Sequence, residues 1–258
     1  MTASFPLVAI AYGLQRLLCR NLHLRFLEMA SSDIFRRPYV YTRLRDNEIR
    51  IAHLQPGEGG NVIVVELSHE LLGTGIAPYR ALSWEWGEAG KAGVDQTIFV
   101  VDKRSTGKEN TKQDMVHMGL LMVRPNLFAA LKRLRGGKEV RLWIDAICVE
   151  QMGTGDDQNA DEKNLEKGDQ ILLMTQIFGT AEDVCIWLGE DGEGDDSAQA
   201  IGFIKKLSNL QDMDVVAELK RGTCDVNDLI AFMKLLKRGW FGRRWIVQVT
   251  YPLPPIWH

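Results

Sequence analysis

Apolar positions in the second half of the chain switch between two periods, which predicts strands and helices in turn. Leucines recur at helical spacing from Leu127 to Leu134, just after Pro125, a residue suited to a first helical turn. The runs 140–149 and 183–188 are continuously apolar, as buried strands of parallel sheets are. Further helices are expected over 164–179, 197–207 and 228–237. Alternating strands and helices predict right-handed crossovers and a mainly parallel sheet flanked by helices.

The first half of the chain reads as short strands instead. The segments 48–54 and 61–67 flank a turn rich in glycine and proline, which indicates a long-loop hairpin. Strands are also expected over 79–84 and 97–101, and the polar stretch 103–113 is expected to be a loop. The fold class is therefore α/β, with amino-terminal β-hairpin strands at the edge of the sheet.

Composition excludes several classes of protein. The chain has 258 residues, a net charge of −3 and 45% hydrophobic residues, which is ordinary for a globular protein and gives a nucleic-acid partner no support. No apolar run is long and uncharged enough for a transmembrane segment. The four cysteines lie far apart, so neither a zinc site nor a disulfide framework is indicated. Together these features favour a cytoplasmic location.

The glycine-rich and acidic segments complete none of the common phosphate or metal motifs. The segment 87–93 lacks the spacing and the hydroxyl residue of a P-loop. The acidic run 191–196 begins like a calcium loop, but Asp196 and Gly202 stand where glycine and glutamate are required. The sequence therefore predicts no metal and no bound cofactor.

Five blocks of sequence carry a family resemblance. They are Tyr79-Arg-Ala-Leu-Ser-Trp84-Glu-Trp86-Gly87, Leu142-Trp143-Ile-Asp145-Ala-Ile-Cys148-Val-Glu-Gln151, Glu166-Lys167-Gly-Asp-Gln170-Ile-Leu-Leu-Met174, Val184-Cys-Ile-Trp187-Leu-Gly189 and Trp240-Phe-Gly-Arg243-Arg244-Trp245-Ile-Val-Gln248. In this order they resemble the fungal heterokaryon incompatibility (HET) domain, over about residues 39–248. The chain departs from the family pattern at Trp84, Glu150 and Val249, where tyrosine, asparagine or aspartate, and glutamate are usual.

The resemblance implies a fungal non-self recognition module that triggers a cell-death reaction when incompatible strains fuse. Its expected partners are other incompatibility or signalling proteins, including further copies of itself. HET domains have been proposed as distant relatives of Toll/interleukin-receptor (TIR) domains, some of which cleave NAD. The resemblance thus adds a TIR-like or flavodoxin-like layering, and an alternative function as a TIR-like enzyme that uses Glu166 and takes NAD as substrate. A third reading is an inactive, truncated product.

Three segments are expected along the chain. Residues 1–36 form an amino-terminal helical segment, packed on the domain or bound to a membrane surface or partner. Residues 37–248 form the HET domain. Residues 249–258 form a proline-rich, shortened tail that we expect to be poorly packed, because proline fits neither central strands nor helix interiors.

The expected site lies at the carboxyl edge of the sheet, where open α/β sheets bind ligands. Glu166 is its candidate catalytic residue. The candidate ligand-binding residues are Trp84, Trp86, Gly87, Asp145, Gln151, Gln170 and Arg244.

Each of these residues also has a purely structural interpretation. The Trp84 and Trp86 rings could be core, and Trp143 and Trp187 are expected to be. Asp145, placed inside the strand 140–149, needs a partner, for which the candidates are Arg141, Arg243 and Arg244. Glu166 would otherwise be an exposed residue at a helix start, favoured there by the helix dipole.

Overall fold

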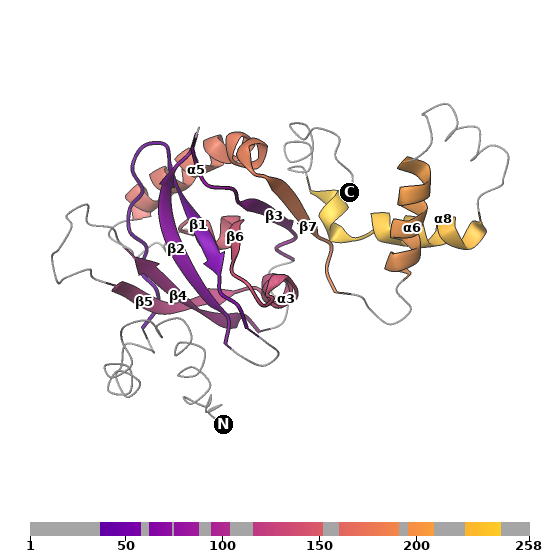
Figure 1. Ribbon diagram of the computed structural model, residues 1–258, viewed down its shortest axis with the longest axis horizontal. Helices are drawn as coiled ribbons and strands as arrows, with labels where there is room; N and C mark the ends of the chain where they lie inside the picture. The colour runs from indigo at the N-terminus through magenta and orange to yellow at the C-terminus, as the bar shows by residue number, and fades with distance from the viewer. Residues whose placement is uncertain are drawn as a thin grey trace, which may run out of the picture. The chain divides into compact units, whose positions relative to one another are not determined.

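The computed structural model describes residues 37–57, 62–73, 75–87, 94–103, 116–151, 160–190, 196–208 and 225–243 (Figure 1). The amino-terminal segment 1–36, the tail 249–258 and Arg244 lie outside these ranges. The chain divides into two compact units at the Trp187–Leu188 boundary.

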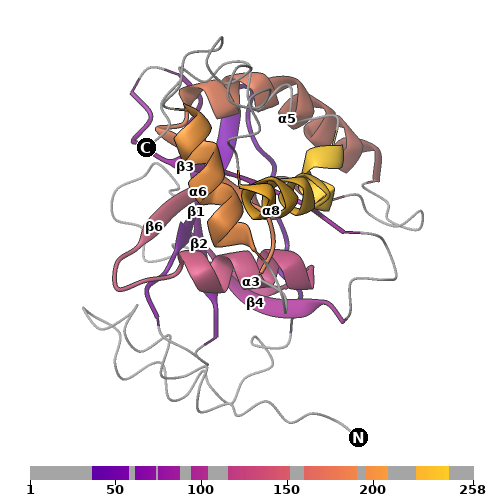
Figure 2. The same ribbon diagram turned by 90° about the vertical axis from the view of Figure 1, so that its right-hand side faces the viewer.

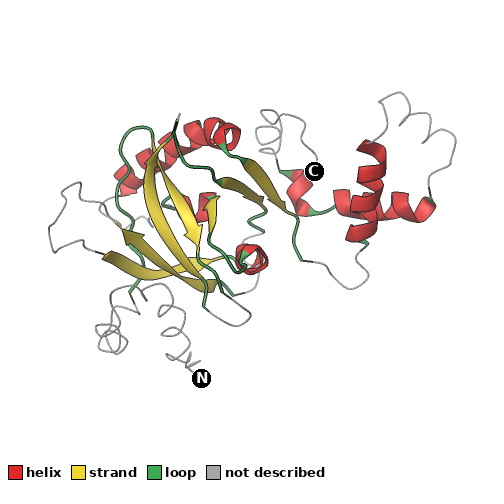
Figure 3. Ribbon diagram, viewed as in Figure 1, coloured by secondary structure: helices red, strands yellow, loops and turns green. Residues whose placement is uncertain are grey.

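The first unit is built on one mixed sheet of seven strands (Figure 3). The strands are β1 (Glu48–Leu54), β2 (Val64–Leu71), β3 (Arg80–Trp84), β4 (Gln96–Lys103), β5 (Val116–Val123), β6 (Val140–Trp143) and β7 (Asp183–Trp187), in the spatial order β5-β4-β2-β1-β6-β3-β7. β1–β2, β1–β6 and β4–β5 are antiparallel pairs, whereas β2–β4, β3–β6 and β3–β7 are parallel. The expectation of a mainly parallel sheet is therefore wrong, because the β1–β2 hairpin supplies the centre of the sheet and not its edge.

Several predicted elements are confirmed. The antiparallel hairpin is confirmed, with β1 over the predicted 48–54, but β2 runs over Val64–Leu71 and not over the predicted 61–67. β3 lies between β6 and β7 and runs parallel to both, so the three expected strands are neighbours. β5 was not predicted, although it pairs with the whole of β4, from Gln96 opposite Val123 to Lys103 opposite Val116.

The helices of this unit are α3 (Pro125–Leu134), the short α4 (Asp145–Cys148) and α5 (Ala160–Thr180). α3 matches the helix expected after Pro125. The predicted strand 140–149 is wrong beyond Trp143, because the chain turns into α4 there. The Asp145 carboxylate accepts a hydrogen bond from the Ala146 amide at 2.8 Å, as suits an acidic residue at a helix start.

The core joins α3 and α5 to the sheet. Leu127 and Leu131 of α3 and Ile177 and Phe178 of α5 are buried in one cluster with the strands. Trp143 is fully buried with its ring edge-on to Phe178, 5.6 Å between centroids, so its predicted core role is confirmed.

β7 departs from the predicted buried strand. Among the described strands it pairs with β3 alone, and Ile186 is exposed. Trp187 is half-buried and donates its indole N–H to Asn126 at 2.8 Å. β7 thus ends the described sheet, where fewer neighbouring strands cover its side chains.

A close approach of two backbones makes Gly119 of β5 a sensitive position. A Cβ at Gly119 would lie 2.5 Å from the Tyr39 Cα, and this contact is with backbone that cannot swing away. We expect Gly119→Ala to lower the free energy of unfolding by about 1–3 kcal/mol, the usual cost of overpacking. Urea denaturation would measure it. Gly136→Ala is the matched control, since its Cβ would meet nothing within 4 Å; equal effects of the two changes would contradict the prediction.

The second unit contains α6 (Ser197–Ser208), α8 (Val226–Leu236) and the short 3-10 helix η2 (Gly239–Gly242). The predicted helices 197–207 and 228–237 are thus confirmed. In Figure 2, α6 and α8 cross each other, and Ala200, Ala231 and Leu235 form a small shared core between them. α8 begins at its N-cap Asp225, which accepts a hydrogen bond from the Asn227 amide at 2.8 Å.

Candidate functional site

Trp84, Trp86 and Asp145 form one hydrogen-bonded cluster. The indole of Trp84 donates to Oδ1 of Asp145 at 2.7 Å, and the indole of Trp86 donates to Oδ2 at 2.9 Å. The two rings stack, with centroids 5.3 Å apart and planes inclined by 23°. Alternate residues of an extended segment point to the same side, which brings both indoles to the one carboxylate.

This geometry corrects the expected environment of Asp145. The residue follows strand β6 and opens α4, so it does not lie inside a strand. Among the described residues, its side-chain partners are two indole N–H groups. Arg244, one of the expected candidates, lies outside the described residues. Arg141 instead pairs with Glu70 at 2.8 Å. A carboxylate that accepts several hydrogen bonds is well compensated when removed from water.

Gly87 and Gln151 flank this cluster. Gly87 follows Trp86 with φ of 74°, a left-handed conformation that favours glycine. The Gln151 side-chain amide donates to the carbonyl oxygens of Asp145 and Val149, each at 3.0 Å, and accepts from Lys167 at 3.3 Å. Gln151 therefore connects the α4 turn to helix α5.

Glu166 lies in a second cluster, around Arg50. The Arg50 guanidinium donates to Oε1 of Glu166 at 2.7 Å and to Oε2 at 3.3 Å, and the Leu44 amide donates to Oε2 at 3.1 Å. Arg50 is fully buried and also donates to the carbonyl oxygens of Cys148 and Thr42. Both carboxylate oxygens of Glu166 are thus occupied within the chain.

The burial of Glu166 contradicts its interpretation as an exposed helix-start residue. Glu166 is only 8% exposed. Helix α5 begins at Ala160 and not near 164, so Glu166 falls in its second turn and faces the sheet. Sequence reasoning missed Arg50, whose signal was available: it is a charged residue between Ile49 and Ile51 in an otherwise apolar stretch of strand.

Gln170 lies one helical turn beyond Glu166 and ties α5 to the start of β1. Its side-chain amide donates to the Glu48 carbonyl oxygen at 2.9 Å, while its Oε1 is buried without a hydrogen-bond partner. The hydrogen bonds of Glu166 and Gln170 thus go to β1 and the segment before it, and not to the tryptophans or Asp145.

The two clusters meet at α4. Asp145 opens this four-residue turn, and Cys148, whose carbonyl oxygen accepts from Arg50, closes it. The structure brings together Trp84, Trp86, Asp145 and Gln151 in one cluster and Glu166 and Gln170 in the other, linked by the turn and by Lys167.

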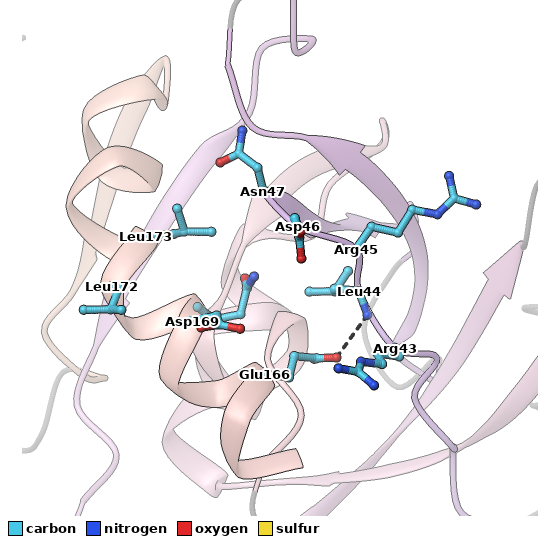
Figure 4. A pocket seen from close by; sticks show the side chains of 10 residues that line it. Arg43, Leu44, Arg45, Asp46, Asn47, Glu166, Asp169, Leu172 and Leu173 are labelled. Atoms are coloured by element: carbon cyan, nitrogen blue, oxygen red, sulfur yellow. Dashed lines mark hydrogen bonds between the residues drawn. The ribbon is translucent and has the colours of Figure 1, made fainter. Parts of the chain in front are cut away.

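A pocket of about 370 Å³ opens beside the second cluster (Figure 4). Residues 43–47 form one wall, and Glu166, Asp169, Gln170, Leu172 and Leu173 of α5 form the other. The pocket walls mix two arginines with three acidic residues, Asp46, Glu166 and Asp169. Glu166 is the only expected catalytic residue, and it borders this pocket while its oxygens are held by Arg50 and Leu44.

The described residues also bear on a thiol nucleophile, a metal site and a membrane span. Burial raises the pKa of the Cys148 thiol to about 12, so it is not a ready nucleophile. Among the described residues, no group of histidine, cysteine and acidic side chains could hold a metal ion. No described helix is long and apolar enough to cross a membrane.

Comparisons with known proteins agree with the sequence blocks. Residues 79–248 match the family described as heterokaryon incompatibility protein (HET). The chain is also similar to heterokaryon incompatibility protein 6, OR allele, of Neurospora crassa, with 24% identity over 199 residues. That match covers 66% of this chain and 27% of the Neurospora protein, so the chain spans about a quarter of its relative's length. No solved structure matches the chain.

The matched region contains both motif carboxylates, Asp145 and Glu166, together with the tryptophan pair. Arg50, the partner of Glu166, lies before it. Because the family match covers well over half of the chain, this protein belongs to the heterokaryon incompatibility (HET) family.

Proposed function

We propose that the chain is a module of fungal non-self recognition that helps to trigger a cell-death reaction by associating with other incompatibility or signalling proteins. Its family membership and its similarity to a Neurospora incompatibility protein support this role. The geometry of the site supports the part of the proposal that says the chain acts by association and not by catalysis.

The observation that carries the proposal is the buried Arg50–Glu166 pair. A carboxylate that cleaves a glycosidic bond must place an oxygen within reach of the substrate. Glu166 instead has both oxygens hydrogen-bonded to Arg50 and the Leu44 amide. Asp145 is likewise held by two indoles. The family motif thus builds a scaffold that holds β1, α4 and α5 together and presents a stable surface.

One observation favours the second candidate, a TIR-like enzyme that cleaves NAD. The pocket beside residues 43–47 reaches Glu166 and carries Arg43 and Arg45, side chains of the kind that bind a pyrophosphate. The parallel strands β6, β3 and β7 are also the part of the sheet that a TIR-like or flavodoxin-like layering requires. Cleavage would require Glu166 to leave Arg50 when substrate binds.

NAD consumption by the purified chain separates the two candidates. We expect no consumption above the rate of the Glu166→Ala variant, because the carboxylate is engaged with Arg50. The assay follows NAD loss and nicotinamide release by chromatography. Turnover that disappears in a folded Glu166→Ala protein would establish the enzyme and contradict action by association.

The death reaction is tested in parallel, by inducible expression in a filamentous fungus with growth and vital-dye uptake as readouts. We expect the intact chain to cause death without a fall in cellular NAD. Loss of NAD that precedes death would favour the second candidate, and the absence of death would remove the proposed function for this chain.

A further inference from the structure

The pocket beside helix α5 presents carboxylates from both of its walls. Asp46 comes from the 43–47 wall and Asp169 from α5, so the two stand on opposite sides of the space (Figure 4). Both residues are exposed, and among the described residues neither carboxylate has a hydrogen-bond or ion-pair partner. Glu166, the third acid of the lining, is already paired with Arg50. Two carboxylates without a counter-charge favour a cation between them.

A buried acceptor in the same pocket also lacks a donor. Gln170 lines the pocket and is only 2% exposed. Its NH₂ group donates to the Glu48 carbonyl oxygen, just beyond the 43–47 wall, which leaves Oε1 of the same amide between that wall and α5. This oxygen has no hydrogen-bond partner in the described part of the chain. Because an unsatisfied buried acceptor is costly, a bound group with N–H donors is favoured here.

The two arginines of the lining do not fill this space. Arg45 extends away from α5 in Figure 4, and Arg43 already has an interaction partner within the chain. The two open carboxylates and the Gln170 oxygen therefore remain as acceptors without a donor. A pocket of about 370 Å³, within the usual range of about 300–1,000 Å³ for ligand sites, has room for a group that supplies several donors.

Leucines complete the surface around these acceptors. Leu44 and Leu173 line the pocket, and Leu172, of the same wall as Leu173, is 82% exposed. An ammonium or guanidinium group at the end of an aliphatic stem matches this combination. Its charged end donates N–H bonds, while its methylene groups cover apolar surface.

We propose that the pocket binds an ammonium or guanidinium cation, carried by a basic side chain of an associated protein or by a free amine. Asp46 and Asp169 supply its counter-charge, and Gln170 accepts one of its N–H groups. This inference deepens the proposed function and rests on it, because association is what brings a basic side chain to the pocket. The cation also has the opposite charge to the pyrophosphate of NAD.

The test is a nuclear magnetic resonance titration of the full 258-residue chain with N-acetylarginine N-methylamide. We expect a dissociation constant of about 0.1–10 mM, and binding of the uncharged citrulline analogue that is about tenfold weaker. Asp46→Asn and Asp169→Asn should each weaken binding of the arginine probe about threefold, the usual scale for an exposed ion pair. Asp161→Asn is the matched control and should change nothing, since Asp161 is an exposed residue of α5 outside the pocket lining.

Arg45→Gln tests the sign of the ligand's charge. Removing this positive charge should tighten a bound cation about twofold and weaken a bound anion, for which inorganic pyrophosphate is the probe. Putrescine distinguishes the two sources of the cation. If the arginine probe binds more tightly than putrescine, the group is a side chain of a partner protein, and the reverse order assigns a free amine. Either order supports the cation site.

Three outcomes would overturn the proposal. They are the absence of saturable binding up to about 50 mM of either cation, equal effects of Asp169→Asn and Asp161→Asn, and pyrophosphate that binds more tightly than the arginine probe. Circular dichroism checks that each variant is folded, and Asp46→Asn replaces Asp169→Asn should the latter unfold. The death reaction judges the proposed function separately. Death without cation binding removes this inference alone, and cation binding without death removes the proposed function alone.

Discussion

Glu166→Gln is expected to cost about 3–5 kcal/mol of the free energy of unfolding, because it leaves the buried Arg50 guanidinium without a counter-charge. For a chain of this size, that loss lowers the melting temperature by roughly 6–20 °C. Differential scanning calorimetry would measure the shift, in the unfolding transition of the unit that contains the sheet. An unchanged melting temperature would mean that Glu166 is not a structural partner of Arg50.

Replacing both partners separates a structural glutamate from a catalytic one. A buried ion pair exchanged for apolar side chains of similar volume is often close to neutral. Arg50→Met combined with Glu166→Leu should therefore recover at least half of the lost melting temperature. Under the association hypothesis the death reaction returns with the fold. If the double variant is stable but inactive, Glu166 has a chemical role and the proposed mechanism fails.

An exposed ion pair of the same length supplies the control. Arg80 and Asp183 are 2.8 Å apart, close to the 2.7 Å of Arg50 and Glu166, yet their side chains are 40% and 55% exposed. Asp183→Asn should change the free energy of unfolding by less than about 1 kcal/mol, since water already solvates both groups. A loss as large as that of Glu166→Gln would show that burial does not explain the difference.

The spacing of apolar residues predicts the helices and strands better than it predicts which strands pair. The spacing of Leu127, Leu131 and Leu134 determines α3 without reference to the rest of the chain. Strand order is different, because the partner of each strand is distant in sequence. The apolar stretch 116–123 follows a long polar run and lacks the alternation of apolar and polar residues that predicts a strand, so its pairing with β4 is evident only from the fold.

The site illustrates the same limit at the level of side chains. Because Asp145 follows the apolar Trp143 and Ile144, its carboxylate is expected to need hydrogen-bond donors, and this expectation is confirmed. The side-chain donors found among the described residues are indoles 61 and 59 residues away, whereas charge alone favours an arginine. Glu166 and Arg50 are 116 residues apart, a separation at which no local periodicity relates two positions. A charged residue within an apolar stretch predicts that the fold supplies a partner for it. The identity of that partner follows only from the fold.

Asp145→Ala is expected to be the second most damaging change, because it leaves two indole N–H groups without an acceptor. Trp84 is 1% exposed, so its N–H cannot turn to water. The substitution also removes the bond from the Ala146 amide. We expect a loss of about 2–4 kcal/mol in the free energy of unfolding, measured by urea denaturation. The emission of the two stacked tryptophans should change with it.

Asp145→Asn separates the structural role of this residue from a role in binding. The amide oxygen can still accept from one indole, but its NH₂ group then faces the other N–H. The free energy of unfolding of Asp145→Asn should therefore lie between that of the natural chain and that of Asp145→Ala. Trp86→Phe, which removes one donor from a half-buried ring, should cost less than Trp84→Phe. If Asp145→Ala were as stable as the natural chain yet abolished the death reaction, the cluster would be a ligand site. The expected graded order of losses in the free energy of unfolding would instead mean that the segment around Trp84 and Trp86 and the segment around Asp145 serve chiefly to hold each other in place.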